Sequence, residues 1–449
     1  MTSRREFLKT TAAAGALLTL PDALAADVPP RKLRLGFIGV GLRGRSHLEL
    51  AIMREDTDIT AICDIDPAAN AESQKMLREA GRKEAAVYQQ GPEDFRNLLK
   101  RDDVDAVIIS TPWEWHAPMA VAAMRAGRYV GLEVPAAVTL EECWQLVQVS
   151  EETNMPCMIL ENVCYRRDVM AVLNMVRQGL FGELLHLECG YQHDLREVKF
   201  NDGKQPYGGG VEFGEKGFSE ARWRTAHAVR RNGDLYPTHG IGPVATMLDI
   251  HYGNRFVSLN SVATKSRGLH KYIVEHGGPD HPNASVEFKL GDIVTTVLRT
   301  ANGETVILSH DTNGPRPYSL GFRVQGTQGI WMDLNASLYI EGLSKKAHAW
   351  EPAAPYLEQY DHPLWKRYGQ DAKGAGHGGM DFFVLHAFIE SAKMRLRPPL
   401  DVYDAAAWSA ISALSEQSIA QGGALVEFPD FTRGRWENRQ RRFALDDRY

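Results

Sequence analysis

Two short segments pair tyrosine with histidine, side chains that can exchange protons with a substrate. Tyr191 and His193 lie two positions apart on an expected strand, so both face the same side of it. Tyr236 and His239 form the second pair. Histidine titrates near neutral pH and works as acid or base, whereas tyrosine acts as a base only when its pKa is strongly lowered. The pattern fits acid–base catalysis, although strand tyrosines commonly only pack, and His239 could instead cap a helix or lie in the core.

A glycine motif indicates a second kind of chemistry, the binding of a dinucleotide. Gly39, Gly41 and Gly44 lie at the end of an apolar segment, residues 33–40, and before a helix-like one, residues 47–53. In this setting the first two glycines allow a tight turn and a close approach to a pyrophosphate, which then lies at a helix N-terminus. A glycine turn that holds no ligand is the alternative.

Asp64 indicates which dinucleotide binds. It follows the second expected strand, residues 59–63, about twenty residues after the motif. A carboxylate there accepts hydrogen bonds from the adenosine ribose and repels a 2′-phosphate, so NAD is favoured over NADP. Arg43 leaves NADP open, because a basic residue in the glycine loop can also meet a phosphate.

The elements that must position these residues fall into two groups. In the first part of the chain, apolar strands alternate with helix-like segments, which predicts an N-terminal Rossmann domain with a doubly wound parallel sheet, residues 31–160. After residue 160 the strands are adjacent and joined by short turns such as residues 301–303, which predicts an α+β domain with a largely antiparallel open sheet, residues 161–449. The expected strands are residues 33–40, 59–63, 106–109, 129–132, 184–191, 257–264, 284–289, 293–300 and 304–310. Residues 404–421 are expected to form a helix and residues 343–380 long loops.

The N-terminus predicts export. Arg4 and Arg5 precede a short apolar run, residues 12–20, and an Ala-x-Ala site ending at Ala25. This is the pattern of a twin-arginine signal peptide, residues 1–25, although a basic, alanine-rich N-terminus can arise by chance. The mature chain is then periplasmic or extracellular, where no pool of soluble nicotinamide cofactor is expected. A bound cofactor would have to be regenerated within each turnover.

Composition excludes several classes. A net charge of −6 on 449 residues argues against a nucleic-acid-binding protein. No segment after the N-terminus approaches the roughly 20 apolar residues that span a bilayer. The five cysteines contain no Cys-x-x-Cys pair, so neither a disulfide framework nor a metal site is expected, and His310 with Asp311 would need further ligands to hold a metal.

Two further motifs resemble those of the Gfo/Idh/MocA oxidoreductase family. They are Ser110-Thr111-Pro112-x-x-x-His116 and Glu133-Val134-Pro135. In that family both lie at the carboxyl ends of strands that face the nicotinamide. The family's usual pattern is Glu-Lys-Pro, whose lysine assists proton transfer from the substrate. Val134 cannot move a proton, which argues against ordinary sugar dehydrogenation.

One branch of that superfamily shares this departure from the Glu-Lys-Pro pattern. The chain resembles glycoside hydrolase family 109, which contains α-N-acetylgalactosaminidases that use NAD, and the resemblance covers nearly the whole chain. The segments that carry it are Trp113-Glu114-Trp115-His116, Glu133-Val134-Pro135-Ala136, Glu161-Asn162-Val163-Cys164-Tyr165, Gly190-Tyr191-Gln192-His193 and Tyr236-Pro237-Thr238-His239-Gly240.

The resemblance implies a role for each candidate residue. His239 is expected to shuttle the proton of the C3 hydroxyl, Tyr191 or His193 to act at C2, and Tyr236 and Glu161 to assist. Tyr191, Arg224, Tyr236 and Tyr318 are expected to contact the substrate. The expected NAD-binding residues are Gly39, Gly41, Leu42, Arg43, Gly44, Asp64, Trp113, Trp115, His116, Glu133, Val134, Asn162, Tyr236 and His239.

The expected reaction is a redox-neutral hydrolysis of a terminal α-linked N-acetylgalactosamine, on a glycan or a small molecule. Oxidation at C3 acidifies the C2 proton, the C1 oxygen leaves by elimination, water adds, and the hydrogen returns to C3 from the recycled NAD. An exported sugar oxidoreductase of the glucose–fructose type with non-dissociating NAD(P) is the alternative, and a silent binding module that keeps NAD for folding is a third. A homodimer through the exposed sheet face is also expected, as in many members of the superfamily.

Overall fold

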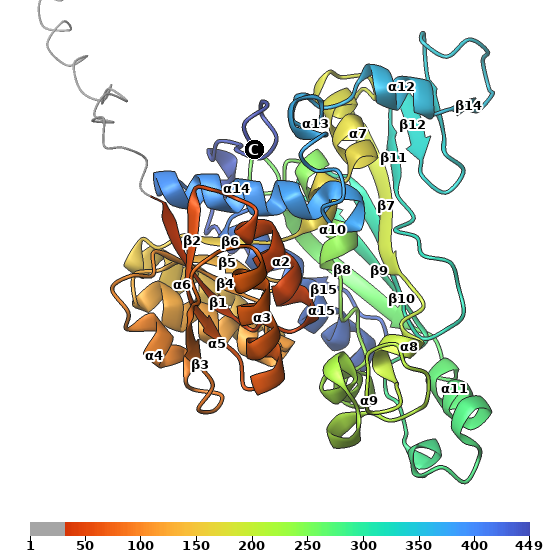
Figure 1. Cartoon of the computed structure of the whole chain (residues 1–449). Coiled ribbons are helices and arrows are strands. Elements are labelled where there is room, and N and C mark those ends of the chain that lie inside the picture. The colour runs from red at the N-terminus through yellow and green to blue at the C-terminus, as the bar shows by residue number, and fades with distance from the viewer. Residues whose placement is uncertain (1–31) are drawn as a thin grey trace, which may run out of the picture. The chain divides into compact units, whose positions relative to one another are not determined.

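The computed structural model describes residues 32–449, and Figure 1 shows their arrangement. Leu33 to Tyr449 form one compact unit. The predicted signal peptide, residues 1–25, lies outside the described residues. The division of the remainder into two domains at residue 160 stays a prediction.

A six-stranded parallel sheet forms the first part of this unit, as expected. Its strand order, β3-β2-β1-β4-β5-β6, is that of a doubly wound dinucleotide-binding fold. Phe37 of β1 pairs with Ile62 of β2 on one side and Ile108 of β4 on the other, and all three are fully buried. Such strands are apolar throughout because helices cover both faces of a parallel sheet. The strands are β1 Leu33–Ile38, β2 Thr57–Cys63, β3 Ala86–Tyr88, β4 Ala106–Ile109, β5 Tyr129–Leu132 and β6 Cys157–Ile159.

Helices connect and cover these strands. Helix α6 begins at a capping box in which Thr139 and Glu142 satisfy each other's backbone N–H groups. Because the connections alternate with parallel strands, the loops after β1, β4 and β5 gather at one edge of the sheet. The helices are α2 Leu42–Ile52, α3 Pro67–Glu79, α4 Phe95–Leu99, α5 Trp113–Arg125 and α6 Leu140–Thr153.

A nine-stranded mixed sheet forms the second part, in the order β14-β13-β12-β11-β7-β10-β9-β8-β15. Only β7 and β10 pair in parallel among its described strands, so the expectation of a largely antiparallel sheet is confirmed. Its strands are β7 Leu184–Gln192, β8 Phe256–Ala263, β9 Ile293–Thr300, β10 Thr305–Asp311, β11 Arg323–Gly326, β12 Gly329–Met332, β13 Ser337–Ile340, β14 Glu351–Pro352 and β15 Val426–Glu427.

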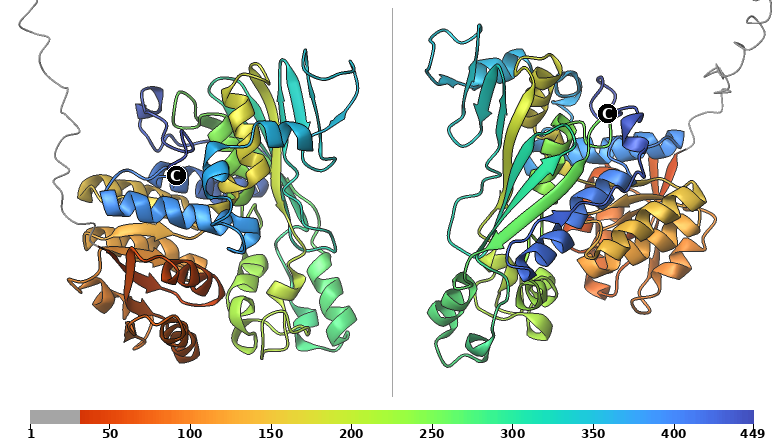
Figure 2. Two further views of the ribbon diagram at one scale, coloured as in Figure 1. Left: turned by 45° about the horizontal axis from the view of Figure 1, so that its top comes forward. Right: turned by 180° about the vertical axis from the view of Figure 1, so that it is seen from behind.

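Two helices late in the chain return to the first sheet. Helix α15 packs between α6 and strand β8, as the right view of Figure 2 shows, and α14 packs against α2. The predicted helix 404–421 is α15, which begins at a capping box of Asp401 and Asp404. The helices of this part are α7 Arg167–Arg177, α8 Arg196–Lys199, α9 Arg224–Arg230, α10 Thr238–Met247, α11 Gly268–Gly277, α12 Ala354–Gln359, α13 Pro363–Tyr368, α14 Met380–Met394 and α15 Val402–Ala420.

The strand expected at residues 284–289 is absent. Pro282–Ser285 form a 3₁₀ turn capped by the side chain of His281, and no regular element follows through Lys289. The alternation of polar and apolar residues there has no neighbouring strand to pair with. Instead, Leu290 N donates to Ala228 O at 3.0 Å.

The long loops expected at residues 343–380 contain two short helices, α12 and α13. Pro355 and Pro363 lie in the first turns of these helices. Proline is favoured there because the N–H it lacks has no helical partner in any case. The five cysteines are buried free thiols, as expected.

Candidate active site

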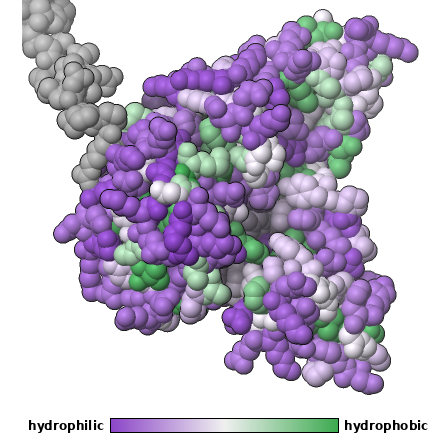
Figure 3. Space-filling model, in the orientation of Figure 1, coloured by the Kyte–Doolittle hydropathy of each residue, from purple (hydrophilic) through white to green (hydrophobic). Residues whose placement is uncertain are grey.

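A single large cavity of about 1110 Å³ joins the two sheets. It is lined by the loops after β1, β4 and β5 on one side and by β7, α9 and α10 on the other. Figure 3 shows the mostly hydrophilic surface hollowed between α3 and the segment of α8 and α9. A volume of this size exceeds the range of typical small-ligand pockets and fits a dinucleotide together with a sugar.

The glycine loop leaves room for a ligand at one position. A β-carbon at Gly39 would lie 2.6 Å from Ser110 O, and one at Gly44 would lie 2.0 Å from Gly39 O, so these two glycines are required by packing. A β-carbon at Gly41 would meet no atom within 4 Å. Gly41 precedes α2 and has no side chain to cap the helix, so N–H groups at this end remain for an anion.

Asp64 accepts hydrogen bonds from the backbone of this loop and of the residues after β2. Its Oδ2 accepts from Val40 N at 2.8 Å and its Oδ1 from Asp66 N at 2.9 Å. Burial raises the pKa of Asp64. The carboxylate also lines the cavity, where ribose hydroxyls could donate to its remaining lone pairs.

Arg43 turns away from the ribose end and into an ion-pair network. Its Nε donates to Glu133 Oε1 at 2.6 Å, and its second guanidinium nitrogen donates to Asp381 Oδ2 at 2.9 Å. His47 Nε2 lies 2.6 Å from the same Glu133 oxygen, while Glu133 Oε2 accepts from Val134 N at 3.0 Å. Burial alone would raise the pKa of Glu133, but the Arg43 charge and the His47 hydrogen bond hold it below its usual range.

Asp381, at the start of α14, is the centre of that network. Besides Arg43 it accepts from Asn162 Nδ2 at 2.7 Å and pairs with His377 Nδ1 at 2.7 Å. Its side chain is only 1 % exposed. Burial would raise the pKa of Asp381, but the His377 hydrogen bond and the Arg43 charge lower it. One carboxylate thus joins the glycine loop, the segment after β6 and the Gly-rich segment before α14.

Three buried polar atoms along this half of the cavity fit a bound nicotinamide cofactor. Ser110 Oγ, His116 Nε2 and Asn162 Oδ1 have no hydrogen-bond partner among the described residues. Buried polar atoms are rarely left unpaired, so each is available to a ligand. His116 Nδ1 lies 2.7 Å from Pro135 O, and burial lowers the pKa of His116, which keeps its ring neutral. Leu42, Trp115 and Val134 complete the lining here.

His239 and Glu161 form a dyad on the opposite wall. His239 lies in the first turn of α10, and a β-carbon at Gly240 would lie 2.7 Å from Gly190 N, so the helix approaches β7 closely. His239 Nδ1 lies 2.7 Å from Oε1 of Glu161, which is fully buried. The carboxylate accepts a hydrogen bond from Nδ1–H. This leaves Nε2 without a proton, as a hydrogen-bond acceptor toward the cavity. His239 therefore does not cap the helix.

Tyr191 lies near the end of β7 and His193 directly follows that strand, and the two side chains meet on one side of it, as their spacing predicted. The Tyr191 hydroxyl is 3.2 Å from His193 Nδ1, and the Tyr191 ring centroid is 5.2 Å from that of His239 and 4.8 Å from that of Tyr236. Burial raises the pKa of Tyr191 to about 12, so its hydroxyl is protonated at neutral pH. Burial and the Arg224 charge lower the pKa of His193, which is a neutral acceptor there.

Arg224 lies at the centre of the sugar-side wall, where its guanidinium lies over the rings of Trp113 and Tyr236 at 5.0 and 5.2 Å. It pairs with Glu220 one turn earlier. Tyr318 is half exposed and its ring centroid lies 4.9 Å from that of His193, at the rim rather than among the lining residues.

Sequence reasoning missed Asp381, which is buried behind Arg43, and three residues that line the cavity. Asp381 lies 338 positions from Arg43, and nothing around it in the sequence marks it as functional. His377 lies in a Gly-rich segment, residues 374–379, and lines the cavity. Tyr207 and Glu220 also line it, and only their proximity in space reveals them. Among residues 32–449, no group of three His, Cys, Asp or Glu side chains is placed to hold a metal ion.

Comparisons with known proteins agree with this arrangement. Residues 33–160 match the oxidoreductase family with an NAD-binding Rossmann fold, and residues 165–438 match the family described as Glycosyl hydrolase 109, C-terminal domain. A "Glycosyl hydrolase family 109 protein" of Stenotrophomonas maltophilia (strain K279a) is 54 % identical over 99 % of both chains. An "Alpha-N-acetylgalactosaminidase" of Tannerella forsythia is 52 % identical over 99 % of both chains.

Solved structures confirm the fold. A levoglucosan dehydrogenase in complex with NADH superposes with a TM-score of 0.64 at 20 % identity, covering 89 % of this chain and 100 % of that one. A putative myo-inositol dehydrogenase from Sinorhizobium meliloti 1021 gives 0.59 at 18 % identity over the same shares. At such identities the likeness concerns the fold alone.

The predicted export route is confirmed. Residues 1–21 match the signal sequence of the twin-arginine translocation pathway, so the chain is exported to the periplasm or beyond. Within residues 32–449, no helix combines the length and the apolar character needed to cross a membrane. The homodimer stays a prediction.

Proposed function

Because this chain belongs to glycosyl hydrolase family 109 and is a glycoside hydrolase, we propose that it removes terminal α-linked N-acetylgalactosamine with a tightly held, recycled NAD. The observation that carries the proposal is one cavity lined by a dinucleotide-binding loop at one end and by the His239–Glu161 dyad at the other. A hydrolase that relied on two carboxylates alone would have no use for the first end.

Retention of NAD is supported by the network around Asp381. The residues that would hold the cofactor are those of the glycine loop, Asp64, His116 and Asn162, with Trp113, Trp115, Glu133 and Val134 beside them. Arg43 is committed to Glu133 and Asp381, and the Asp64 carboxylate lines the cavity and would repel a 2′-phosphate, which favours NAD. When bound, NAD supplies a reversible acceptor for the hydrogen on C3 of the sugar, which makes the neighbouring C2 proton acidic.

His239 is the residue we assign to the C3 hydroxyl. With Nδ1 donating to Glu161, Nε2 takes the hydroxyl proton as C3 is oxidised and returns it when C3 is reduced. Glu161 is a positioning residue, since it acts through His239 and stabilises the positively charged ring. This dyad takes the role of the family's lysine, whose position Val134 occupies in this chain.

Tyr191 and His193 are assigned together to C2. At rest the Tyr191 hydroxyl donates to the neutral His193. As the Tyr191 oxygen takes the C2 proton, its own proton passes to His193 Nδ1, so neither group carries a full negative charge. The C1–O bond then breaks, the departing oxygen takes the proton from His193, and water adds its OH group to C1 and its other proton to C2. Arg224, Tyr236 and Tyr318 are assigned to hold the sugar.

Hydrolysis in deuterium oxide tests this sequence of steps. Proton removal at C2 predicts a product that carries deuterium at C2, detected by loss of the C2 proton signal in the NMR spectrum. A product that keeps its original C2 proton contradicts the elimination, because direct displacement at C1 leaves C2 untouched.

A further inference from the structure

The cavity continues past Arg224 to a segment that the steps above do not use, residues 201–222. This segment leaves β7 and α8 and returns to α9 through two 3₁₀ turns, Gly214–Lys216 and Ser219–Arg222. Its residues that line the cavity include Pro206, Tyr207, Phe218, Ser219 and Glu220.

Asn201 fixes the base of the segment. This asparagine is 1 % exposed; its Nδ2 donates to Phe218 O at 2.8 Å, and its Oδ1 accepts from Gly203 N and Phe218 N at 3.0 Å each. Its backbone also exchanges two hydrogen bonds with Glu212, at 2.9 and 3.1 Å. These bonds join the two ends of the segment that carries Tyr207.

Tyr207 has an unusual backbone conformation for its type. Its side chain is 57 % exposed although it lines the cavity, and its φ is +58°, in the left-handed region that disfavours bulky residues. Three glycines follow directly, residues 208–210. A tyrosine kept in a strained conformation where glycine would be free of strain indicates that its ring is used.

Glu220 and Arg224 line the same cavity as Tyr207. Burial and the Glu220 carboxylate raise the pKa of Tyr207, while the Arg224 charge opposes the change. Glu220 uses Oε2 to bind Arg224, and its side chain is still 29 % exposed. A partly exposed aromatic ring and a partly exposed carboxylate, both from the segment of residues 201–222, therefore line this cavity.

We propose that Tyr207 and Glu220 form a second sugar subsite, which binds the sugar to which the terminal N-acetylgalactosamine is attached. A pyranose has an apolar C–H face that packs on an aromatic ring and hydroxyl groups that donate to a carboxylate. An aryl or lipid substituent would use the ring but not Glu220, so a sugar fits the pair best. This inference rests on the proposed function.

The test compares two substrates with one variant and two controls. The substrates are methyl α-N-acetylgalactosaminide and a disaccharide in which the same sugar is α-linked to a hexose. Tyr207→Asn removes the ring but keeps a residue that tolerates a positive φ, Tyr207→Phe keeps the ring, and His348→Asn changes an exposed residue with φ of +58° far from the cavity lining. The variant Tyr207→Asn should lower kcat/KM for the disaccharide about tenfold and for the methyl glycoside less than twofold. Both controls should match the wild type.

Equal kcat/KM losses on the two substrates, or none on the disaccharide, would overturn the subsite while the proposed function stands. A wild type that cleaves neither substrate would overturn the proposed function, and the subsite with it.

Discussion

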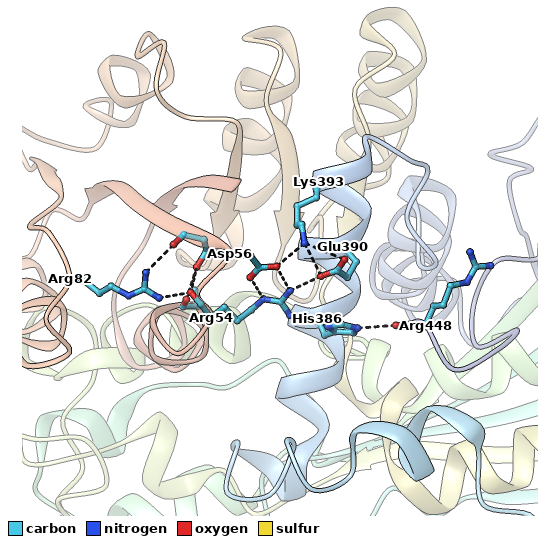
Figure 4. A network of polar contacts seen from close by, with 9 residues as sticks. Arg54, Asp56, Arg82, His386, Glu390, Lys393 and Arg448 are labelled. Atoms are coloured by element: carbon cyan, nitrogen blue, oxygen red, sulfur yellow. Dashed lines mark hydrogen bonds and ion pairs between the residues drawn. The ribbon is translucent and has the colours of Figure 1, made fainter. Parts of the chain in front are cut away.

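Helices α2 and α14 are joined by a polar network at each end, and the two networks differ in what they border. At the N-terminal ends, Arg43 of α2 donates directly to Asp381 of α14, and Glu133 joins Arg43 to His47. At the C-terminal ends, Arg54 and Asp56 meet Glu390 and Lys393, as Figure 4 shows.

The C-terminal network is complete without a ligand. Arg54 donates to both oxygens of Asp56 at 2.9 and 2.7 Å, to Glu390 at 2.6 Å, and lies 2.9 Å from His386 Nδ1. The Arg54, Asp56, Glu390 and Lys393 side chains are 19 to 33 % exposed, and none of them lines the cavity. Partly exposed pairs of this kind contribute little to stability.

The N-terminal network is buried and borders the cavity. Glu133 and Asp381 are 7 % and 1 % exposed, and the neighbouring Asn162 keeps an unpaired oxygen. Charges are buried at a cost, so a buried network beside a cavity indicates selection for function rather than for stability. We infer that the N-terminal network helps to bind the cofactor, whereas the C-terminal network only stabilises the fold.

The largest effect is expected from a substitution of His239, which should affect catalysis but not cofactor binding. His239→Ala should lower kcat roughly 10³-fold, because the proton acceptor for the C3 hydroxyl is lost. Bound NAD, measured after acid release from the purified variant, should match the wild type. A kcat near the wild-type value would refute the assigned role, and a parallel loss of NAD would make His239 a cofactor residue.

Asp381→Asn should weaken NAD binding strongly. Breaking a buried ion pair costs about 3 kcal/mol, which corresponds to roughly 100-fold in the dissociation constant if the whole loss falls on the cofactor site. NAD titration of the stripped protein measures the constant. Asp168→Asn is the matched control, since Asp168 forms a partly exposed pair with Arg166 outside the cavity. Equal constants for Asp381→Asn and Asp168→Asn would contradict a role of the N-terminal network in holding NAD.

Acid should release NAD only at low pH. The pKa values of Glu133 and Asp381 are lowered in the folded protein, so their contribution is present above the unfolded values of about 4 and is lost as the pH falls through the lower folded-state values. The bound fraction should stay constant from about pH 7 to about pH 4. The bound fraction is measured by equilibrium dialysis. Release of NAD between about pH 7 and 5 would instead indicate that protonation of a histidine controls binding.

His377→Ala should have a modest and purely kinetic effect. The side chain is 59 % exposed, so its pair with Asp381 is worth less than about 1 kcal/mol and the melting temperature should not change. Loss of its contact at the cavity should speed NAD release by about twofold to fivefold, measured by displacement with excess labelled NAD. An unchanged release rate would exclude His377 from cofactor retention.

Glu390→Gln should have the smallest effect. Removing one charge from the C-terminal network should lower the free energy of unfolding by less than about 1 kcal/mol, because Arg54 and Lys393 keep Asp56. The NAD release rate should equal that of the wild type. A faster rate would show that the two ends of the helix pair are coupled.

The fold and half of the site could be predicted from local patterns. Strand periodicity, the Gly39–Gly44 motif and the spacing of Tyr191 and His193 each reflect a constraint between neighbouring residues, so a single sequence reveals them. Asp381 could not be found in this way, because its contacts are with Arg43 and Asn162 in distant segments. Tyr207 and Glu220 could not be found either, because the sequence does not show which residues of a loop line the cavity. The false strand at residues 284–289 has the same cause, since alternation shows which side chains face together but not whether a partner strand exists.

The central claim is that the exported enzyme carries its own NAD and regenerates it in every cycle. The direct measurement is release of nitrophenol from p-nitrophenyl α-N-acetylgalactosaminide by the purified mature protein, with no cofactor added and bound NAD quantified in the same sample. The claim predicts many turnovers per NAD. Release that stops after one equivalent of bound NAD, or that continues undiminished in protein stripped of NAD, would contradict it.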